Sequence, residues 1–161
     1  MSIRAEEPAD IAAIHNVVEQ AFLRPLEAVL VDQLRAGGNI AISLVAVKDR
    51  GIVGHVLFSN LIAPFKALAL APASVAPDRR RSGIGSAMIR EGLSRATDDG
   101  WRAVLVVGDP KYYRRFGFSP DCARGLTSPY SGPHFMLLAL NGDCPDAIGK
   151  VSYATPFAAL N

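Results

Sequence analysis

The sequence contains little cysteine. Cys122 and Cys144 are its two cysteines, and neither belongs to a CxxC pair or to a metal-ligand spacing. This scarcity argues against a disulfide framework and against a zinc site, because both need several cysteines at short spacing. We expect free thiols, no bound metal and a reducing compartment.

Net charge and long apolar runs are also lacking. Seventeen Lys and Arg residues against fifteen Asp and Glu residues leave a formal net charge of +2. Such a balance does not indicate a nucleic-acid-binding protein or a polybasic membrane-surface protein. The longest apolar stretch, residues 61–75, is interrupted by Pro64, Lys66 and Pro72, so it cannot supply the roughly 20 apolar residues that span a bilayer. The acidic residues Glu6, Glu7 and Asp10 interrupt any apolar run near the N-terminus, so we expect no signal peptide. We therefore expect a cytoplasmic protein without nucleic-acid or membrane partners.

What the sequence does contain is enough apolar material for a core. Half of the 161 residues are hydrophobic and one fifth are charged. These proportions are typical of a folded globular protein and exclude disordered, collagen-like and coiled-coil classes. The length suits one domain and is too short for two ordinary ones. We expect a single domain over residues 1–161.

The apolar periodicity predicts alternating helices and strands. Helices are expected at residues 10–22, 26–36, 83–99 and 112–116, and strands at residues 43–48, 52–59, 67–75, 103–107, 135–140 and 150–153, with a tight turn at residues 49–51. In the first two helices, the side chains expected to face the core are Ile11, Ile14, Val18, Ala21, Phe22, Leu26, Val29, Leu30 and Leu34. This order predicts an α/β or α+β domain in which helices pack on a mixed sheet.

The most informative stretch is residues 74–93, SVAPDRRRSGIGSAMIREGL. A strand ends, a turn with three consecutive arginines follows, and Gly83 and Gly85 open a helix. Glycine has no Cβ, so a ligand can come close to the backbone there. The first N–H groups of a helix lack partners inside the helix and carry about half a positive charge. The stretch therefore predicts an anion site that suits a pyrophosphate.

Several interpretations of this stretch compete. One is simply a solvated basic loop before a helix. A Walker phosphate loop is excluded, because GxxxxGK[ST] is absent. A dinucleotide-binding fingerprint needs a small third residue, but Met88 occupies that position. Asp109 nevertheless follows the next strand, where such proteins place an acidic residue. The remaining interpretation is a coenzyme A-binding turn.

Two motifs support that interpretation. The segment Arg80-Arg81-Ser82-Gly83-Ile84-Gly85 matches the Q/R-x-x-G-x-G/A motif of the GNAT superfamily of N-acetyltransferases. The segment YYRRFGF, residues 112–118, resembles the second signature of that family, a tyrosine four residues before a Gly-Phe pair. WRAVLVVGDP, GHVLFS and HFMLLAL are similar to the YhbS-like subgroup. The resemblance implies a GNAT-type fold, with a central, mostly antiparallel mixed sheet flanked by helices.

The resemblance also implies acetyl-CoA as co-substrate. The pantetheine arm would pair with the exposed backbone of Ala73, Ser74 and Val75. The pyrophosphate would be held by the backbone N–H groups of Arg80, Arg81, Ser82, Gly83, Ile84, Gly85 and Ser86.

For the chemistry, the resemblance implies direct attack of a neutral primary amine on the thioester. A backbone N–H near Val75 would stabilise the oxyanion. Tyr113 matches the family tyrosine and would act as general acid for the leaving thiolate, whereas Tyr112 is expected to be a packing residue. The acceptor is expected to be a small-molecule or protein amine, and the assembly of two copies into a homodimer is left open.

The general base stays open at this point. Residues 68–71 offer no proton acceptor, and the candidates are Glu27, His55, Asp109 or a relayed water. His55 lies on an apolar strand, where a core histidine is the simpler interpretation. Two alternative functions remain: an acyl-CoA-binding sensor without turnover, favoured by the missing base, and a nucleotide-binding oxidoreductase domain, favoured by the GxG sequence and Asp109.

Overall fold

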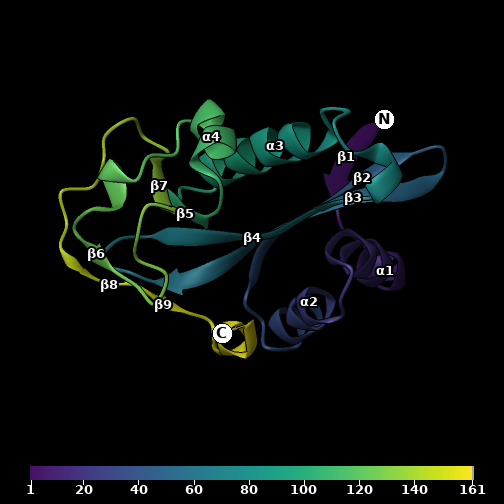
Figure 1. Ribbon diagram of the computed structural model, residues 1–161, viewed down its shortest axis with the longest axis horizontal. Coiled ribbons are helices and arrows are strands. Elements are labelled where there is room, and N and C mark those ends of the chain that lie inside the picture. Colours follow the sequence, from purple (N-terminus) through teal and green to yellow (C-terminus); the bar gives the residue numbers. More distant parts are fainter. Residues whose placement is uncertain (161) are drawn as a thin grey trace. The chain divides into compact units, whose positions relative to one another are not determined.

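The chain forms two compact units in the computed structural model, which describes residues 1–160 (Figure 1). The first unit comprises Met1–Ser59, Ala71–Gly92 and the C-terminal residues from Ala154. The second unit comprises Asn60–Leu70 and Leu93–Tyr153. The single domain expected over residues 1–161 stays a prediction.

Helices and strands alternate along the chain. The helices are η1 (Pro8–Asp10), α1 (Ile11–Phe22), α2 (Leu26–Ala36), η2 (Pro77–Arg79), α3 (Ile84–Asp98), α4 (Pro110–Tyr113), η3 (Arg114–Phe116), η4 (Asp121–Ala123) and η5 (Thr155–Leu160), where η marks 3-10 helices. The strands are β1 (Ser2–Ala5), β2 (Ile40–Lys48), β3 (Gly51–Ile62), β4 (Ala67–Val75), β5 (Ala103–Val107), β6 (Leu126–Thr127), β7 (Phe135–Ala139), β8 (Gly149–Lys150) and β9 (Ser152–Tyr153). The predicted helices and strands are therefore confirmed with shifts of a few residues at their ends, except the strand at residues 150–153, which is divided between β8 and β9.

In the first unit the strand order is β1-β2-β3-β4. The predicted hairpin between β2 and β3 is confirmed. Asp49 and Arg50 both have positive φ, 52° and 63°, as a two-residue turn between twisted antiparallel strands requires. Strand β1 was not predicted, because four residues of mixed polarity carry no periodicity. It forms by pairing antiparallel with β2, in the register Ser2 to Val47.

Helices cover both faces of this sheet: α1 and α2 lie on one side, and the first part of α3 lies on the other (Figure 1). Gly54 in β3 explains how α3 comes so close. A Cβ at Gly54 would lie 2.7 Å from the Met88 methyl carbon. The bulky Met88 is thus accommodated by a strand glycine rather than by a small residue on the helix.

The predicted core faces of α1 and α2 are partly wrong. Ile14, Val18, Leu30 and Leu34 are buried as expected. Four predicted core residues are instead more than one third exposed, namely Ile11, Phe22, Leu26 and Val29. The buried face of α2 runs through residues 27/28, 30/31 and 34 at helical spacing, so Leu26 and Val29 lie beside it.

In the second unit, β5 pairs parallel with β4 and antiparallel with β7. The predicted strand at residues 150–153 is divided: β8 pairs with β6, whereas β9 pairs with the end of β3. One hydrophobic cluster in the core of this unit comprises Ala67, Ala103, Leu105, Ala123, Leu126, Phe135, Leu137 and Val151. Together with the first unit, these pairings confirm the predicted mixed, mostly antiparallel sheet with flanking helices.

The expectation of two free thiols is wrong. Cys122 and Cys144 form a disulfide, with their Cα atoms 5.3 Å apart. Cys122 lies in η4 and Cys144 follows β7, at a sequence separation of 22. The fold of the second unit brings the two cysteines together. Their positions in the sequence, far apart and outside any motif, do not predict this proximity. The reducing compartment inferred from free thiols therefore loses that support.

Candidate functional site

Strand β4 leads directly into the arginine loop, which we define as residues 77–83. The loop begins with the 3-10 turn η2. Near its end, two residues have left-handed backbone, Arg81 at φ 62° and Gly83 at φ 83°. Gly83 is exposed, and a Cβ built on it would meet no atom within 4 Å. The space beside its backbone is therefore open.

Helix α3 starts immediately after this glycine. Ile84 is buried and anchors the first turn, while the N–H of Ala87 donates to the Gly83 carbonyl at 3.0 Å. The amides of Ile84 and Gly85 precede that first bond and point out of the helix end. A helix end of this kind attracts anions through its amides and its dipole.

Side chains tie the arginine loop to the rest of the first unit. Arg79 forms an ion pair with Asp49 of the hairpin turn, at 2.8 Å. Arg80 donates to the Ala21 carbonyl in the last turn of α1, at 2.7 Å. Arg81 is exposed. The loop thus has a defined shape and carries a cluster of positive charge next to the start of α3.

The predicted pantetheine-binding segment, Ala73 to Val75, forms the end of β4 in the same unit. Ala73 and Val75 are half-buried, whereas Ser74 is 2% exposed. Among the described residues, the Ser74 hydroxyl has no hydrogen-bond partner. The structure therefore brings this segment and residues 80–86 onto one continuous stretch of the first unit.

Tyr113 lies in α4 of the second unit. Its ring lies against the backbone of Gly108, where a Cβ would be only 2.4 Å from Tyr113 Cε2. It also makes an edge-on contact with Phe118, with ring centroids 5.8 Å apart. Burial, with a smaller effect from Tyr112, raises the pKa of Tyr113 to about 12. The phenol is therefore protonated at neutral pH, the form that a general acid needs.

Two of the candidate bases have structural partners. Glu27 is buried and accepts from Arg24 Nε at 2.8 Å, so its charge is already neutralised. Asp109 caps α4, and its side chain accepts from the Lys111 N–H at 2.9 Å. A capping aspartate is explained by the helix that it begins.

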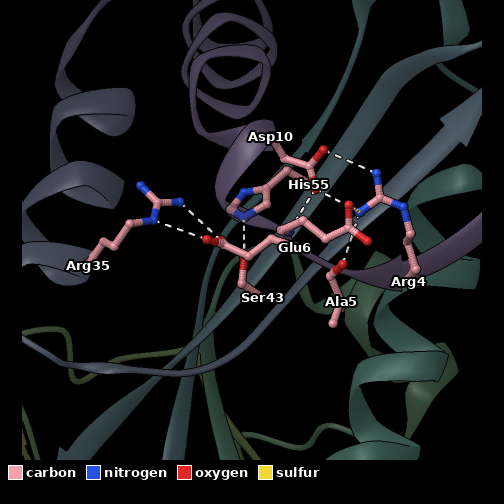
Figure 2. A network of polar contacts seen from close by, with 8 residues as sticks. Arg4, Ala5, Glu6, Asp10, Arg35, Ser43 and His55 are labelled. Carbon is pink, nitrogen blue, oxygen red and sulfur yellow. Dashed lines mark hydrogen bonds and ion pairs between the residues drawn. The ribbon is translucent and has the colours of Figure 1, made fainter.

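His55 belongs to a polar network that is buried at His55 and Ser43 and half-buried at Glu6 and Arg35, which Figure 2 shows. Its Nε2 is 2.8 Å from Ser43 Oγ, and Ser43 Oγ in turn donates to the Glu6 carboxylate in a short hydrogen bond. Arg35 of α2 donates twice to the same carboxylate, at 3.0 and 3.1 Å. The network joins residues from four separate parts of the first unit.

The pKa of His55 argues against this residue as the general base that deprotonates the amine. Burial, which outweighs the effect of Glu6, lowers the pKa to about 4. Taking a proton from an ordinary ammonium of pKa about 10.4 would then cost about 9 kcal/mol. His55 is accordingly a neutral, hydrogen-bonded core residue, in agreement with the simpler of its two interpretations.

With this geometry in hand, comparisons with known proteins decide the family. A family model described as "Acetyltransferase (GNAT) domain" matches residues 39–120, which include β4, the arginine loop and α4. This chain belongs to the GNAT acetyltransferase family. It is therefore an acyltransferase, which decides against the oxidoreductase interpretation, and its mixed sheet is the GNAT fold.

Relatives of this GNAT chain cover almost its whole length. It is 36% identical over 164 residues to YhbS of Escherichia coli K12, named as an uncharacterized N-acetyltransferase, with 98% of both chains covered. A crystal structure of Escherichia coli YhbS in complex with CoA superposes with a TM-score of 0.91 at 30% identity, covering 98% of this chain and 91% of that one. A GNAT family acetyltransferase from Brucella melitensis in complex with acetyl-CoA gives 0.83 at 37% identity, covering 97% of both chains.

Residues 1–160 lack both a membrane-spanning helix and a group of metal ligands. No helix there is long and apolar enough to cross a membrane. In the same residues, no group of three or more His, Cys, Asp or Glu side chains is arranged to hold a metal ion.

Sequence reasoning missed one part of this GNAT chain, the buried network of Glu6, Arg35, Ser43 and His55. Its members are scattered over 50 residues, and no motif contains them. The one signal was a polar residue on each of two apolar strands, Ser43 and His55.

Proposed function

We propose that the protein transfers an acetyl group from acetyl-CoA to a primary amine by direct attack in a ternary complex. The observation that carries the proposal is the open backbone at Gly83 beside the start of α3. It suits a diphosphate, because a side chain at this position would occupy the space that the phosphates need. The complexes of two relatives with CoA and acetyl-CoA support the same ligand.

In this proposal the backbone N–H groups of residues 80–86 bind the pyrophosphate. The backbone of Ala73, Ser74 and Val75 binds the pantetheine arm, and the N–H near Val75 donates to the acetyl oxygen as negative charge develops on it. The neutral amine nitrogen forms a bond to the acetyl carbon and becomes positively charged. It then loses a proton to solvent water as the carbon–sulfur bond breaks. Tyr113, protonated at neutral pH, gives its proton to the leaving thiolate and is reprotonated from solvent.

We further propose that the amine loses its proton to solvent water before it attacks. Glu27 is paired with Arg24, Asp109 caps α4, and His55 has a pKa of about 4. The rate at limiting amine should then rise with pH up to the pKa of the amine itself. A profile that keeps the same pKa for amines of different basicity would indicate an enzyme base instead.

Release of the CoA thiol against a panel of primary amines tests the function. The expected result is amine-dependent thiol release with formation of the acetylated amine. Calorimetry with acetyl-CoA accompanies it. Binding without release for any amine would indicate the non-catalytic acyl-CoA-binding module. The identity of the acceptor, a homodimeric assembly and a cytoplasmic location stay predictions.

A further inference from the structure

The buried network fixes which nitrogen of His55 carries the proton. Partial burial opposes ionisation of Glu6, but hydrogen bonds from Arg35 and Ser43 outweigh it and lower the pKa of the carboxyl. Glu6 is therefore a carboxylate that only accepts, and the Ser43 proton points to it. The contact between Ser43 Oγ and His55 Nε2 must then use the Nε2 proton. Because the imidazole is neutral, His55 Nδ1 is left as a bare acceptor.

That acceptor lies inside the protein without a partner. His55 is completely buried, and among the described residues Nδ1 makes no hydrogen bond. A buried acceptor of this kind is unfavourable, because it has lost its water without gaining a donor. A hydroxyl group nearby would satisfy it.

The pairing of β3 with β4 brings such a hydroxyl to the right position. Ala76 N donates to the Val53 carbonyl at 2.8 Å, so these two residues are opposite each other. Counted two residues further along β3 and two back along β4, this register predicts that Ser74 lies opposite His55. Opposite residues point to the same face, with Cβ atoms about 4.5–5.5 Å apart. Ser74 is also buried and its hydroxyl also lacks a partner.

We propose that His55 is a positioning residue for acetyl transfer: rotation of the Ser74 hydroxyl about its Cα–Cβ bond brings it to Nδ1, and the hydrogen bond that then forms between these two buried, unpartnered groups holds the end of β4. Ser74 is the one polar residue in the segment Ala73 to Val75, so its hydroxyl is the side-chain group through which a hydrogen bond can fix the backbone of that segment. The next amide, that of Val75, is the proposed oxyanion donor. This inference rests on the proposed function.

The contacts of Glu6 and Arg35 explain why the core position 55 carries a histidine. Glu6 follows β1 and Arg35 lies in the last turn of α2, so the network connects β4 to parts of the first unit that are far away in sequence. A leucine at position 55 would fill the space but could not hold Ser74. The histidine is thus better explained by orientation of the strand than by stability, since buried polar networks often specify geometry without adding stability.

The test uses His55→Leu, Ser74→Ala and the double variant, with Ser59→Ala as the matched control. Ser59 is a second buried serine whose hydroxyl has no partner among the described residues, but it is outside the segment Ala73 to Val75. The readout is the infrared carbonyl stretch of isotope-labelled acetyl-CoA bound to the full chain, which reports the hydrogen bond to the acetyl oxygen. Calorimetry gives the affinity, and circular dichroism checks folding.

We expect the wild type and Ser59→Ala to lower the stretching frequency equally. His55→Leu and Ser74→Ala should each lose most of that shift, and the double variant should lose no more than either single one, because both act on one contact. His55→Gln can offer one donor and one acceptor, and should recover part of the shift. Turnover in the single variants should fall about 10-fold, less than the roughly 100-fold or more for removing an oxyanion donor outright.

An unchanged carbonyl shift in folded His55→Leu, or losses that add in the double variant, overturns the positioning role while leaving the proposed function intact. If the wild type fails to bind acetyl-CoA, the proposed function falls and the positioning role falls with it.

Discussion

The arginine loop and the buried network of His55 lie in the same unit, yet they are built in opposite ways. The loop is exposed and continuous in sequence, and its main feature is the backbone of adjacent residues at Gly83 and the start of α3. The network is buried at Ser43 and His55, is half-buried at Glu6 and Arg35, and connects side chains that are distant in sequence. Binding of an anion can be encoded locally, because adjacent amides already point in one direction. Holding a strand in place needs partners that only folding brings together.

The largest expected effect tests the local side of this comparison. Gly83→Glu should abolish acetyl-CoA binding, because a carboxylate about 4 Å from a phosphate costs about 4 kcal/mol, or roughly 1000-fold in affinity. Calorimetry measures the loss. Gly100→Glu is the matched control, since Gly100 has the same φ of 83° and the same open surroundings. Unchanged affinity in folded Gly83→Glu would rule out the loop as the diphosphate site.

The next effect concerns the second sequence motif. Tyr113→Phe should lower kcat by about 100-fold, the usual contribution of a general acid, while the affinity for acetyl-CoA stays within a few-fold. The ring would still pack on Gly108, so folding should be preserved. Tyr112→Phe serves as the control and should stay close to wild type in a stopped-flow assay of thiol release. Because the pKa of Tyr113 is about 12, ionisation of the phenol should not limit the rate below about pH 11. Equal kcat values for wild type and Tyr113→Phe would remove the acid role.

On the long-range side, replacing both Cys122 and Cys144 by serine should lower the free energy of unfolding by about 3 kcal/mol, as expected for the 22-residue separation of the disulfide. Urea unfolding with and without a reductant measures it, and the double variant should not respond to the reductant. Two reactive thiols in unfolded, unreduced wild type would show that the cross-link does not form.

The smallest effect concerns the start of α1. Asp10 accepts from Arg4 at 2.7 and 3.1 Å and from the Glu7 N–H at 2.7 Å. The hydrogen bonds from Arg4, opposed by burial and helped by Glu7, lower the pKa of Asp10. Asp10→Asn should therefore destabilise the protein by about 1–2 kcal/mol at pH 7.

A group with a lowered folded pKa stabilises the protein above its unfolded pKa, and this contribution is lost as the pH falls through the folded value. The difference between wild type and Asp10→Asn should thus shrink below about pH 4 in urea unfolding experiments. Asp121→Asn is the control, because its ion pair with Arg124 is exposed and should contribute little. A gap for Asp10→Asn that stays constant with pH would contradict this account.

Much of the fold was predictable from the sequence. Strand β4 lies at the residues that periodicity indicated, and α3 begins and ends within one residue of its prediction. These elements are long and regular, so their own residues specify them. Strand β1 was missed, because it is short and exists only through β2. The core face of α2 was misjudged at Leu26 and Val29, because periodicity does not say which of two adjacent stripes meets the sheet.

The sequence by itself determined the arginine loop and the family, because glycine, arginine and a helix start act over a few adjacent residues and leave a motif. Only the tertiary structure decided the disulfide, the partners of Glu27 and Asp109, and the state of His55. Those depend on burial and on side chains that are distant in sequence. Removal from water sets the pKa of His55 and leaves its Nδ1 in need of a donor, and no local pattern of residues records how deeply a position will be buried.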